Sequence, residues 1–397
     1  MQKLIRITVA GDLMCKGREA ELLFAKFGEY RFSDYIGELK PVFSSSDYVI
    51  GNLETPVCTY EKAADTIVSF NTPVQFLDAL KEVGFNFLSL ANNHCLDCGI
   101  EGLESTIQNV RQRGFDCDGA FLSREESERV CVVNVRGLRI AIVSSTFGTN
   151  SDINGVMLPE DEIWRVALTR TQYRYRRISV PKDSINETAS RVYVTDCSNP
   201  VAIGNPKNEF FLEKILAKIT RAKMIADLVI ALPHLGGQYN PGPAAYTKYV
   251  VKRMKDAGAD IVIAGHPHTV HRCESWKRGR PFCAYSLGNT CFTPGIGYFI
   301  PNTLAEYGVI LHLDIDEQEK RLAGVRFNVV KSVLDDGGCA HTVPVSKLWD
   351  EERIVALRDR MEMETEAVVN RFCGTGENIK IEREYQLPEH DGFIVRG

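Results

Sequence analysis

Two histidines, His266 and His268, follow an apolar run at 260–264 that is typical of a buried strand. They stand in a Gly-His-Pro-His sequence, and a short turn at a strand end can direct both imidazoles toward one point above the sheet edge. Imidazole nitrogen is a good ligand for borderline divalent metals, and a rigid turn leaves the two rings little entropy to lose on binding. The spacing after a buried strand therefore indicates a metal site, whereas the same spacing in a polar loop would carry little meaning.

Other apolar runs also end on residue types that bind metals. In open α/β sheets the ligand site lies beyond the carboxyl ends of the strands. We therefore expect these strand-end side chains to converge with the two histidines. They are Asp12, Glu54, Asn93, His94 and His234, with Asp97 three residues beyond His94.

This set of side chains predicts a centre with one or two divalent cations. A carboxylate such as Glu54 can bridge two cations, while carboxylate and amide oxygens and imidazole nitrogens complete a mixed ligand set that suits Mn, Fe, Zn or Mg. Two cations about 3.5–4 Å apart would clamp an oxyanion and lower the pKa of a bound water. His94 could protonate a leaving group, and Asp97 could orient its ring.

Each of these residues also has a plain structural role open to it. Asp12 and Glu54 can cap a helix or a turn, Asn93 can form a turn, and His94 can be a hydrogen-bonded core histidine. A coincidence of all these roles at successive strand ends is the less economical explanation.

The elements that must position these residues alternate between strands and helices. Nearly continuous apolar runs predict strands that are covered on both faces, at 4–10, 48–52, 85–91, 227–233, 259–264 and 282–286. Amphipathic spacing predicts helices at 100–113, 210–226 and 244–257, and a further helix that starts at Thr72-Pro73 and stops at Gly84. This alternation favours a layered α/β fold.

Two predicted hairpins make the sheets mixed. Residues 131–135 and 138–144 flank a tight turn at Arg136-Gly137, and residues 307–314 and 322–330 form a second pair. No glycine-rich nucleotide-binding sequence is present, so a plain dinucleotide-binding architecture fits poorly.

The segment 150–208 is polar and rich in turns, and it reads as an insertion or lid near the site. Its arginines suit carboxylate or phosphate, so they are candidate substrate ligands, although a solvated strand of a small subdomain is the simpler explanation. A charged amphipathic helix is expected at 346–372, followed by an irregular tail. The arginines are Arg170, Arg174, Arg176 and Arg177.

Composition narrows the classes of protein. Forty-seven basic and 52 acidic residues give a net charge of −5, so no general attraction to nucleic acid is expected. The N-terminus enters a strand directly, without a signal-peptide apolar region, and no apolar run is long enough to span a membrane. A cytoplasmic protein without an integral membrane segment is expected. Its 12 cysteines lack a framework spacing and are expected to be reduced thiols.

The ordered motifs resemble the bacterial capsule-synthesis protein CapA family, which is linked to poly-γ-glutamate capsule synthesis. That family in turn is similar in fold to the calcineurin-like metallophosphoesterases. The resemblance covers residues from about 3 to 294. The motifs are Gly11-Asp12, Asn52-Leu53-Glu54, Asn92-Asn93-His94, His234-Leu235-Gly236, Gly265-His266-Pro267-His268 and Tyr285-Ser286-Leu287-Gly288-Asn289.

The resemblance implies a four-layer sandwich of two mixed β-sheets flanked by helices, with the metal centre at one edge. From this resemblance together with the sequence pattern, we expect a CapA-like domain at 1–330, with 150–208 as an insertion or lid, and a C-terminal helical extension at 331–397. In that architecture Asp12 and His268 would hold one cation, and Asn93, His234 and His266 the other. Glu54 would bridge them, and His94 would be the acid. Asn289 is a candidate substrate ligand together with Arg174, Arg176 and Arg177, whose role is expected from the basic stretch itself.

Two positions depart from the phosphoesterase pattern. Met14 stands where a histidine is usual, and Glu54 stands where an aspartate usually bridges the cations. The first cation site is therefore expected to be weak, empty or filled only when substrate is bound.

Three functions remain open on the sequence alone. The first is a metal-dependent, hydrolase-type member of the CapA family that serves capsule or poly-γ-glutamate synthesis, with capsule-synthesis proteins as partners. The second is a metallophosphatase or phosphodiesterase that acts on a phosphate ester. The third is a non-catalytic accessory subunit of a polymer-synthesis complex, against which the full set of predicted ligands argues.

Overall fold

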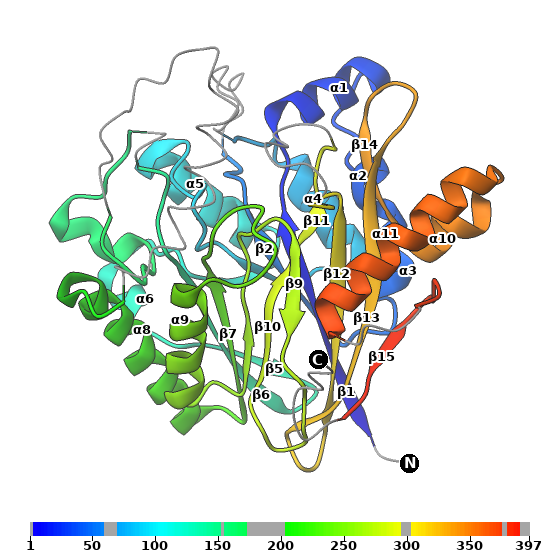
Figure 1. The fold of residues 1–397 in the computed structure, drawn as a ribbon. Helices are drawn as coiled ribbons and strands as arrows, with labels where there is room; N and C mark the ends of the chain where they lie inside the picture. The colour runs from blue at the N-terminus through cyan, green and yellow to red at the C-terminus, as the bar shows by residue number, and fades with distance from the viewer. Residues whose placement is uncertain are drawn as a thin grey trace.

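The computed structural model describes residues 3–58, 70–151, 155–172, 203–294, 303–374 and 379–389. Two mixed β-sheets face each other, and helices cover the outer face of each sheet (Figure 1). The four-layer α/β arrangement that the resemblance implies is thus confirmed. No helix of the described residues combines the length and the apolar character needed to cross a bilayer.

The first sheet contains the N-terminal strand at its centre. Its strands are β1 (Leu4–Leu13), β2 (Tyr48–Leu53), β3 (Phe87–Ser89), β4 (Asp116–Asp118), β11 (Asn289–Cys291), β12 (Tyr307–Asp316), β13 (Leu322–Leu334), β14 (Ala340–Pro344) and β15 (Tyr385–Leu387). The order is β14–β13–β12–β1–β2–β3–β4, with β11 beside β1 and β15 beside β13. Because β1 runs parallel to β2 and antiparallel to β12, this sheet is mixed.

The second sheet is built around four parallel strands, with one antiparallel strand at each side. Its strands are β5 (Cys131–Val135), β6 (Leu138–Thr146), β7 (Leu228–His234), β8 (Ile261–Ile263), β9 (Val270–Cys273) and β10 (Phe282–Leu287), in the order β5–β6–β7–β8–β10–β9. The predicted β5–β6 hairpin is present. Its two turn residues, Arg136 and Gly137, have φ of 53° and 91°, as tight hairpin turns that match the strand twist require.

Helices bury their apolar sides against the outer faces of the sheets. Those on the first sheet include α1 (Gly17–Phe27), α2 (Ser33–Ile36), α3 (Lys40–Phe43), α4 (Gln75–Val83) and α5 (Gly99–Gln112), with the 3₁₀ turn η1 (Gly37–Leu39). Those on the second sheet are α8 (Pro206–Ile225) and α9 (Ala245–Asp256). The remaining helices are α6 (Arg124–Glu128), η2 (Glu160–Arg165), α10 (Val345–Glu351) and α11 (Val355–Cys373).

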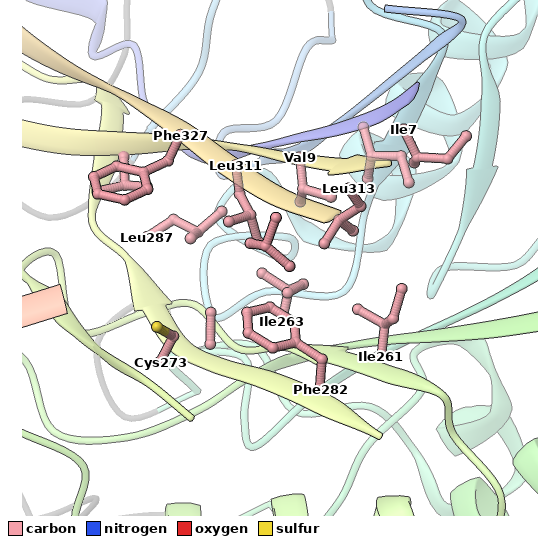
Figure 2. Close-up of a cluster of buried hydrophobic side chains, with 14 of the residues drawn as sticks. Ile7, Val9, Ile261, Ile263, Cys273, Phe282, Leu287, Leu311, Leu313 and Phe327 are labelled. Atoms are coloured by element: carbon pink, nitrogen blue, oxygen red, sulfur yellow. The ribbon is translucent and has the colours of Figure 1, made fainter. Parts of the chain in front are cut away.

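The largest apolar core lies between the two sheets. Val9, Leu311 and Leu313 of the first sheet face Ile263 and Phe282 of the second (Figure 2). Both sheets therefore have one face against this core and the other against helices, which explains why their strands read as nearly continuous apolar runs.

Each apolar run predicted as a strand contains one, and both hairpins are present, but the boundaries move. The strand expected at 85–91 spans only Phe87–Ser89, whereas β1 continues past residue 10 to Leu13. Thr72 was expected to cap α4, but that helix begins at Gln75 with Val74 as its N-cap. The Thr72 hydroxyl instead donates to the carbonyl oxygen of Cys15, because this buried group has a partner in another element.

The C-terminal region differs from the helical extension that was expected. The predicted boundary after residue 330 falls inside β13. The helix expected at 346–372 is two helices, α10 and α11, and the tail that was expected to be irregular adds β15 to the first sheet. The periodicity of a segment does not reveal a strand such as β15, which forms only by pairing with a strand far away in the sequence.

Candidate metal centre

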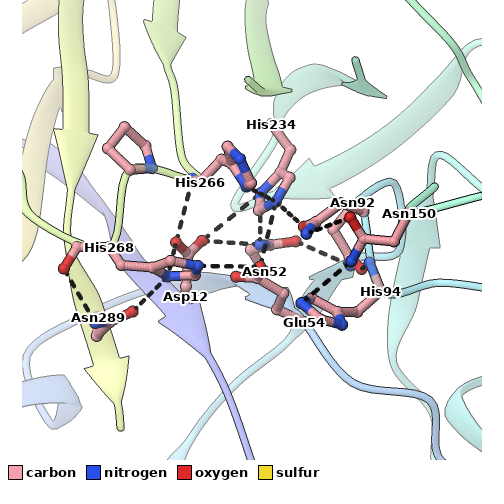
Figure 3. A network of polar contacts seen from close by, with 12 residues as sticks. Asp12, Asn52, Glu54, Asn92, His94, Asn150, His234, His266, His268 and Asn289 are labelled. Carbon is pink, nitrogen blue, oxygen red and sulfur yellow. Dashed lines mark hydrogen bonds and ion pairs between the residues drawn. The ribbon is translucent and has the colours of Figure 1, made fainter. Parts of the chain in front are cut away.

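The predicted ligands lie together where strands of both sheets end (Figure 3). Asp12 of β1 is in register with Asn52 of β2 and with Asn289 of β11, which places three polar side chains of the first sheet at one level. His234 ends β7 and bridges to Gly265, the residue that begins the turn after β8. The site therefore uses ends of five strands from two sheets.

Glu54 is the residue around which both groups of donors assemble. Donor atoms of Glu54, His234 and His266 lie within 4.8 Å of one another, and so do those of Asp12, Glu54 and His268. The Glu54 side chain is fully buried, and neither of its carboxylate oxygens accepts a hydrogen bond from the described residues. A buried carboxylate without a partner is costly, so this position is suited to a bound cation.

The surroundings of His234 Nε2 fit a cation in the same way. This nitrogen lies 2.7 Å from Asn93 Oδ1, 3.2 Å from His266 Nδ1 and 3.4 Å from Glu54 Oε1. A ring nitrogen carries at most one proton and can satisfy only one of these neighbours. Four donor atoms that face each other without enough protons could hold a metal ion through mixed nitrogen and oxygen ligands.

His268 is oriented by Asn289. The Asn289 amide nitrogen donates to the carbonyl oxygens of His268 and Ala305, so its Oδ1, 3.0 Å from His268 Nδ1, must accept a hydrogen bond from the ring N–H. His268 Nε2 is then left with a lone pair, 3.7 Å from Glu54 Oε1. Metal-binding histidines generally donate their second nitrogen to an oxygen in this manner. Asn289 was expected to bind substrate, but its contacts are those of a residue that positions a ligand.

The turn after β8 is held in an uncommon backbone conformation. His266 and His268 have φ of 97° and 55°, in the left-handed region that residues other than glycine seldom adopt. The backbone N–H of His266 donates to Asp12 Oδ2, and a β-carbon on Gly265 would lie 2.9 Å from Asp12 Oδ1. Strain of this kind gathers at functional sites, where the surrounding structure holds it in place.

Burial controls the charge state of the site. Burial, with the nearby Glu54 charge, raises the pKa of Asp12 to about 7, and burial raises the pKa of Glu54 to about 8. Burial lowers the pKa of His234 to about 4 and that of His268 to about 3. The imidazoles of His234 and His268 are thus neutral at pH 7, the form that binds metals, and the charge of His94 opposes the effect of burial on Glu54 only in part.

His94 lies at the side of this cluster, and its pKa is raised, whereas the pKa values of His234, His266 and His268 are lowered. Its Nδ1 donates to Asp97 Oδ2 at 2.7 Å, and its Nε2 lies 3.5 Å from the amide nitrogen of Asn150. Burial acts to lower the pKa of His94, but the charge and the hydrogen bond of Asp97 raise that pKa above its ordinary value. Phe70 stacks on the ring at a centroid distance of 3.9 Å. His94 is therefore a fixed imidazole that can hold a proton at neutral pH.

Some residues of the site were not singled out from the sequence. Asn52 donates to Asp12 Oδ1 at 2.8 Å, and Asn150 accepts from the Asn93 amide at 3.2 Å. Asn150 follows the end of β6, so the strand-end argument could have found it. Met14, which replaces a histidine of the phosphoesterase pattern, is buried with Phe70 and Tyr239 in an apolar cluster beside the site.

The predicted arginine arm is only partly described. Arg174, Arg176 and Arg177 lie outside the described residues. Arg170 is described and is buried, with its Nε donating to the carbonyl oxygen of Phe147 at 2.9 Å.

A model of the bacterial capsule synthesis protein PGA_cap matches residues 6–294. The chain is 28% identical over 308 residues to the capsule biosynthesis protein CapA of Bacillus anthracis. The aligned region covers 76% of this chain and 63% of that relative. It is 26% identical to the PGA biosynthesis protein CapA of Bacillus subtilis, and the aligned region covers 77% of this chain and 67% of that relative. The chain therefore spans about two thirds of the length of these relatives.

Similarities beyond these are more distant. A probable polyglutamine synthesis accessory protein of Mycobacterium tuberculosis is 24% identical, over 62% of this chain and 56% of the relative. A solved structure of a novel phosphatase from Mycoplasma pneumoniae covers 83% of this chain and 94% of its own, at 13% identity and a TM-score of 0.44. That score is low, so the architecture is defined here by the sheet topology of the chain itself.

Proposed function

The chain belongs to the bacterial capsule synthesis protein family, and on that basis we propose that it is a metal-dependent hydrolase of capsule or poly-γ-glutamate synthesis. The observation that carries the proposal is the fully buried Glu54 carboxylate, which has histidine nitrogens on both sides and accepts no hydrogen bond from the described part of the chain.

We propose that the donors are divided between two cations. Asn93, His234 and His266 would hold one, Asp12 and His268 would hold the other, and Glu54 would contact both. The mixed oxygen and nitrogen set suits Mn, Fe, Zn or Mg. Such cations, when bound, polarise a substrate carbonyl or phosphoryl oxygen and supply a hydroxide at neutral pH.

The protein's own residues supply the acid. His94 holds a proton that it can give to the leaving group, and Asp97 stabilises the protonated ring and keeps its orientation. Phe70 covers one face of the ring, so the imidazole cannot rotate away from the site.

Metal analysis tests the centre directly. Purified wild-type protein is expected to contain a divalent metal, and the double variant His234→Ala, His266→Ala is expected to lose most of it. The variant His341→Ala is the matched control, because His341 lies in β14 and is not among the predicted ligands. Unchanged metal content in the double variant would reject the assignment.

Hydrolysis assays separate the candidate functions. Mn²⁺-loaded protein is incubated with γ-linked glutamate oligomers, and in parallel with a phosphomonoester and a phosphodiester. Cleavage of the oligomers supports the proposal, whereas cleavage of an ester alone identifies a phosphatase or phosphodiesterase. A protein that binds metal but cleaves none of them fits an accessory subunit. The cytoplasmic location and the partnership with capsule-synthesis proteins stay predictions.

A further inference from the structure

Two cysteines from separate parts of the chain lie together at the turn that carries His94. Cys58 follows β2, and Cys98 is the N-cap of α5. A β-carbon built on Gly102 would lie 3.7 Å from Cys58 Sγ and 3.9 Å from Cys98 Sγ, so both sulfurs line the same small space. The two side chains are hydrogen-bonded to each other, and both cysteines are free thiols. Cys98 is partly exposed, which gives a small oxidant access to the pair.

This contact makes one thiol a stronger acid than the other. The hydrogen bond with Cys98 lowers the pKa of Cys58, and the hydrogen bond with Cys58, together with burial, raises the pKa of Cys98. A cysteine of lowered pKa beside a second thiol is the arrangement in which a peroxide reacts with the first and the second resolves the product. Cys95 and Cys98 stand in a Cys-x-x-Cys sequence, but burial raises the pKa of Cys95 to about 12. Cys58 is therefore the better nucleophile.

The pair is also connected to the segment that covers His94. The Cys98 thiol donates to the Phe70 carbonyl oxygen at 3.6 Å. The Phe70 backbone N–H donates to Asp97 Oδ2 at 2.8 Å, and this oxygen also accepts from His94 Nδ1. The Phe70 ring stacks on the His94 ring. A chemical change at Cys98 therefore acts on Phe70 and, through it, on the surroundings of His94.

We propose that Cys58 and Cys98 are a redox pair, which hydrogen peroxide converts into a reversible disulfide. The Cys58 thiolate attacks the peroxide, an S–O bond forms, the O–O bond breaks, and hydroxide leaves as water with the proton that the thiol gave up. The Cys98 sulfur then attacks Cys58, the S–O bond breaks, and the oxygen leaves with the Cys98 proton as a second water. Two thiols and one peroxide thus give one disulfide and two waters. This inference goes beyond the proposed function and does not depend on it.

The disulfide is expected to loosen Phe70. Because a disulfide has no S–H group, the Phe70 carbonyl oxygen loses the Cys98 donor, and the two sulfurs must move toward each other. Since Phe70 covers His94, oxidation then changes the surroundings of the proposed acid. In a reducing compartment the pair stays a dithiol, in line with the reduced thiols that the sequence predicts.

Peroxide treatment of the whole chain tests the pair. The native protein is treated with hydrogen peroxide, remaining thiols are alkylated after unfolding, and the digested peptides are identified by mass spectrometry. We expect a peptide that joins Cys58 to Cys98, and its loss after reduction with dithiothreitol. Hydrogen exchange at the Phe70 amide is expected to be severalfold faster in the oxidised protein than in the reduced protein.

Matched controls come from the same turn. Cys95→Ser removes the other cysteine of the Cys-x-x-Cys sequence and is expected to keep the bond between Cys58 and Cys98. Cys58→Ser is expected to form no disulfide at Cys98 and, after the same treatment, to keep the Phe70 exchange rate of the reduced protein. Cys58→Ala replaces Cys58→Ser if the latter does not fold.

The inference is overturned if no disulfide forms, or if Cys98 joins Cys95 or another cysteine instead of Cys58. A disulfide that leaves the Phe70 exchange rate unchanged overturns the connection to His94. Neither readout requires turnover, so a protein that forms this disulfide but cleaves nothing would keep the inference and lose the hydrolase proposal.

Discussion

At the scale of single residues, the charge of the buried Glu54 carboxylate determines whether the site needs a bound cation. Burial raises its pKa to about 8, and the imidazoles of His234 and His268 beside it are neutral at pH 7 because burial lowers their pKa values. An uncompensated buried carboxylate is destabilising by several kcal/mol. The arrangement is therefore stable in its ionised form when a cation is bound between these side chains.

Asn289 orients a predicted metal-binding histidine through hydrogen bonds and is not itself a predicted metal ligand. Its amide is used in full by the ring and the backbone of His268 and by the Ala305 carbonyl. It fixes which nitrogen of His268 carries the proton, and so which nitrogen faces Glu54. This is a positioning role, and the sequence motif alone did not distinguish it from substrate binding.

The acid role of His94 leads to the first prediction. In His94→Asn the leaving group loses its proton donor, so turnover is expected to fall by about 10²–10⁴-fold on whichever substrate the wild type cleaves. Metal content, measured on the same preparation, is expected to stay at the wild-type level because His94 is not an assigned ligand. Full turnover in this variant would refute the role.

At the scale of elements, strand ends and their turns decide where donor atoms point. β1 loses regular pairing with β2 between Val9 and Asp12, and this irregularity accompanies the placement of Asp12 opposite both Asn52 and Asn289. Irregular pairing of this kind commonly re-aims a side chain beside an active site. Gly11 has no room for a side chain, because a β-carbon there would lie 2.1 Å from the Gly288 carbonyl oxygen.

The close approach of Gly265 to Asp12 gives the second prediction. In Gly265→Ala the new β-carbon would meet Asp12 Oδ1 at 2.9 Å, so the carboxylate must shift and metal affinity is expected to fall about tenfold. Gly148→Ala is the control, since a β-carbon there has no heavy atom within 4 Å. Metal titration of both variants measures the effect, and equal affinities would contradict it.

Asp227 ties β6, β7 and the β12–β13 turn together. Its carboxylate accepts from the backbone N–H and guanidinium of Arg139 and pairs with Lys320 Nζ at 3.0 Å. The hydrogen bond from the Arg139 side chain holds the pKa of Asp227 well below its ordinary value. Arg139 and Lys320 are 55% and 45% exposed, so solvent screens these pairs and the expected contribution is modest.

The third prediction concerns pH. Because the pKa of Asp227 is lower in the folded state, its stabilisation is present above the unfolded value of about 3.9 and is lost as pH falls through the folded value. Asp227→Asn is therefore expected to be less stable than the wild type by about 1 kcal/mol at pH 7. The difference should shrink steadily below about pH 4. Urea unfolding at several pH values checks this, and a gap that does not vary with pH would oppose it.

At the scale of the whole molecule, the core between the sheets joins the two halves of the site. Ile263 and Phe282 of the second sheet pack toward Leu311 and Leu313 of the first (Figure 2). Since Asp12, Glu54 and Asn93 come from the first sheet and its loops, and His234 and His266 from the second, the relative position of the sheets sets the distances between the donors.

The fourth prediction tests that coupling. Phe282 is fully buried between the sheets, so Phe282→Ala is expected to lower the free energy of unfolding by about 3–5 kcal/mol. Metal affinity is expected to fall as well, because the sheets lose a rigid contact beneath the site. Val132→Ala, at a half-exposed position of β5, is the control. Denaturant unfolding and metal titration on the same samples measure both effects, and a stability change without loss of affinity would argue against the coupling.

The sequence by itself determined the elements and the types of ligand. Apolar runs predicted the strands, and the polar residues that follow them predicted the donors, because both signals are local: a strand needs an apolar side chain at nearly every position, and a metal site needs oxygen and nitrogen donors. Glu54, His234 and His266 were found in this way.

Tertiary structure alone decided how those elements combine. The division of the strands between two sheets, the strands β14 and β15 beyond the predicted boundary, and the orienting role of Asn289 depend on partners far away in the chain. The same holds for Lys16 and Phe70, which stand well apart in sequence yet meet beside His94. Local periodicity records which face of an element is apolar, but not which other element covers it, and only the packed chain supplies that contact.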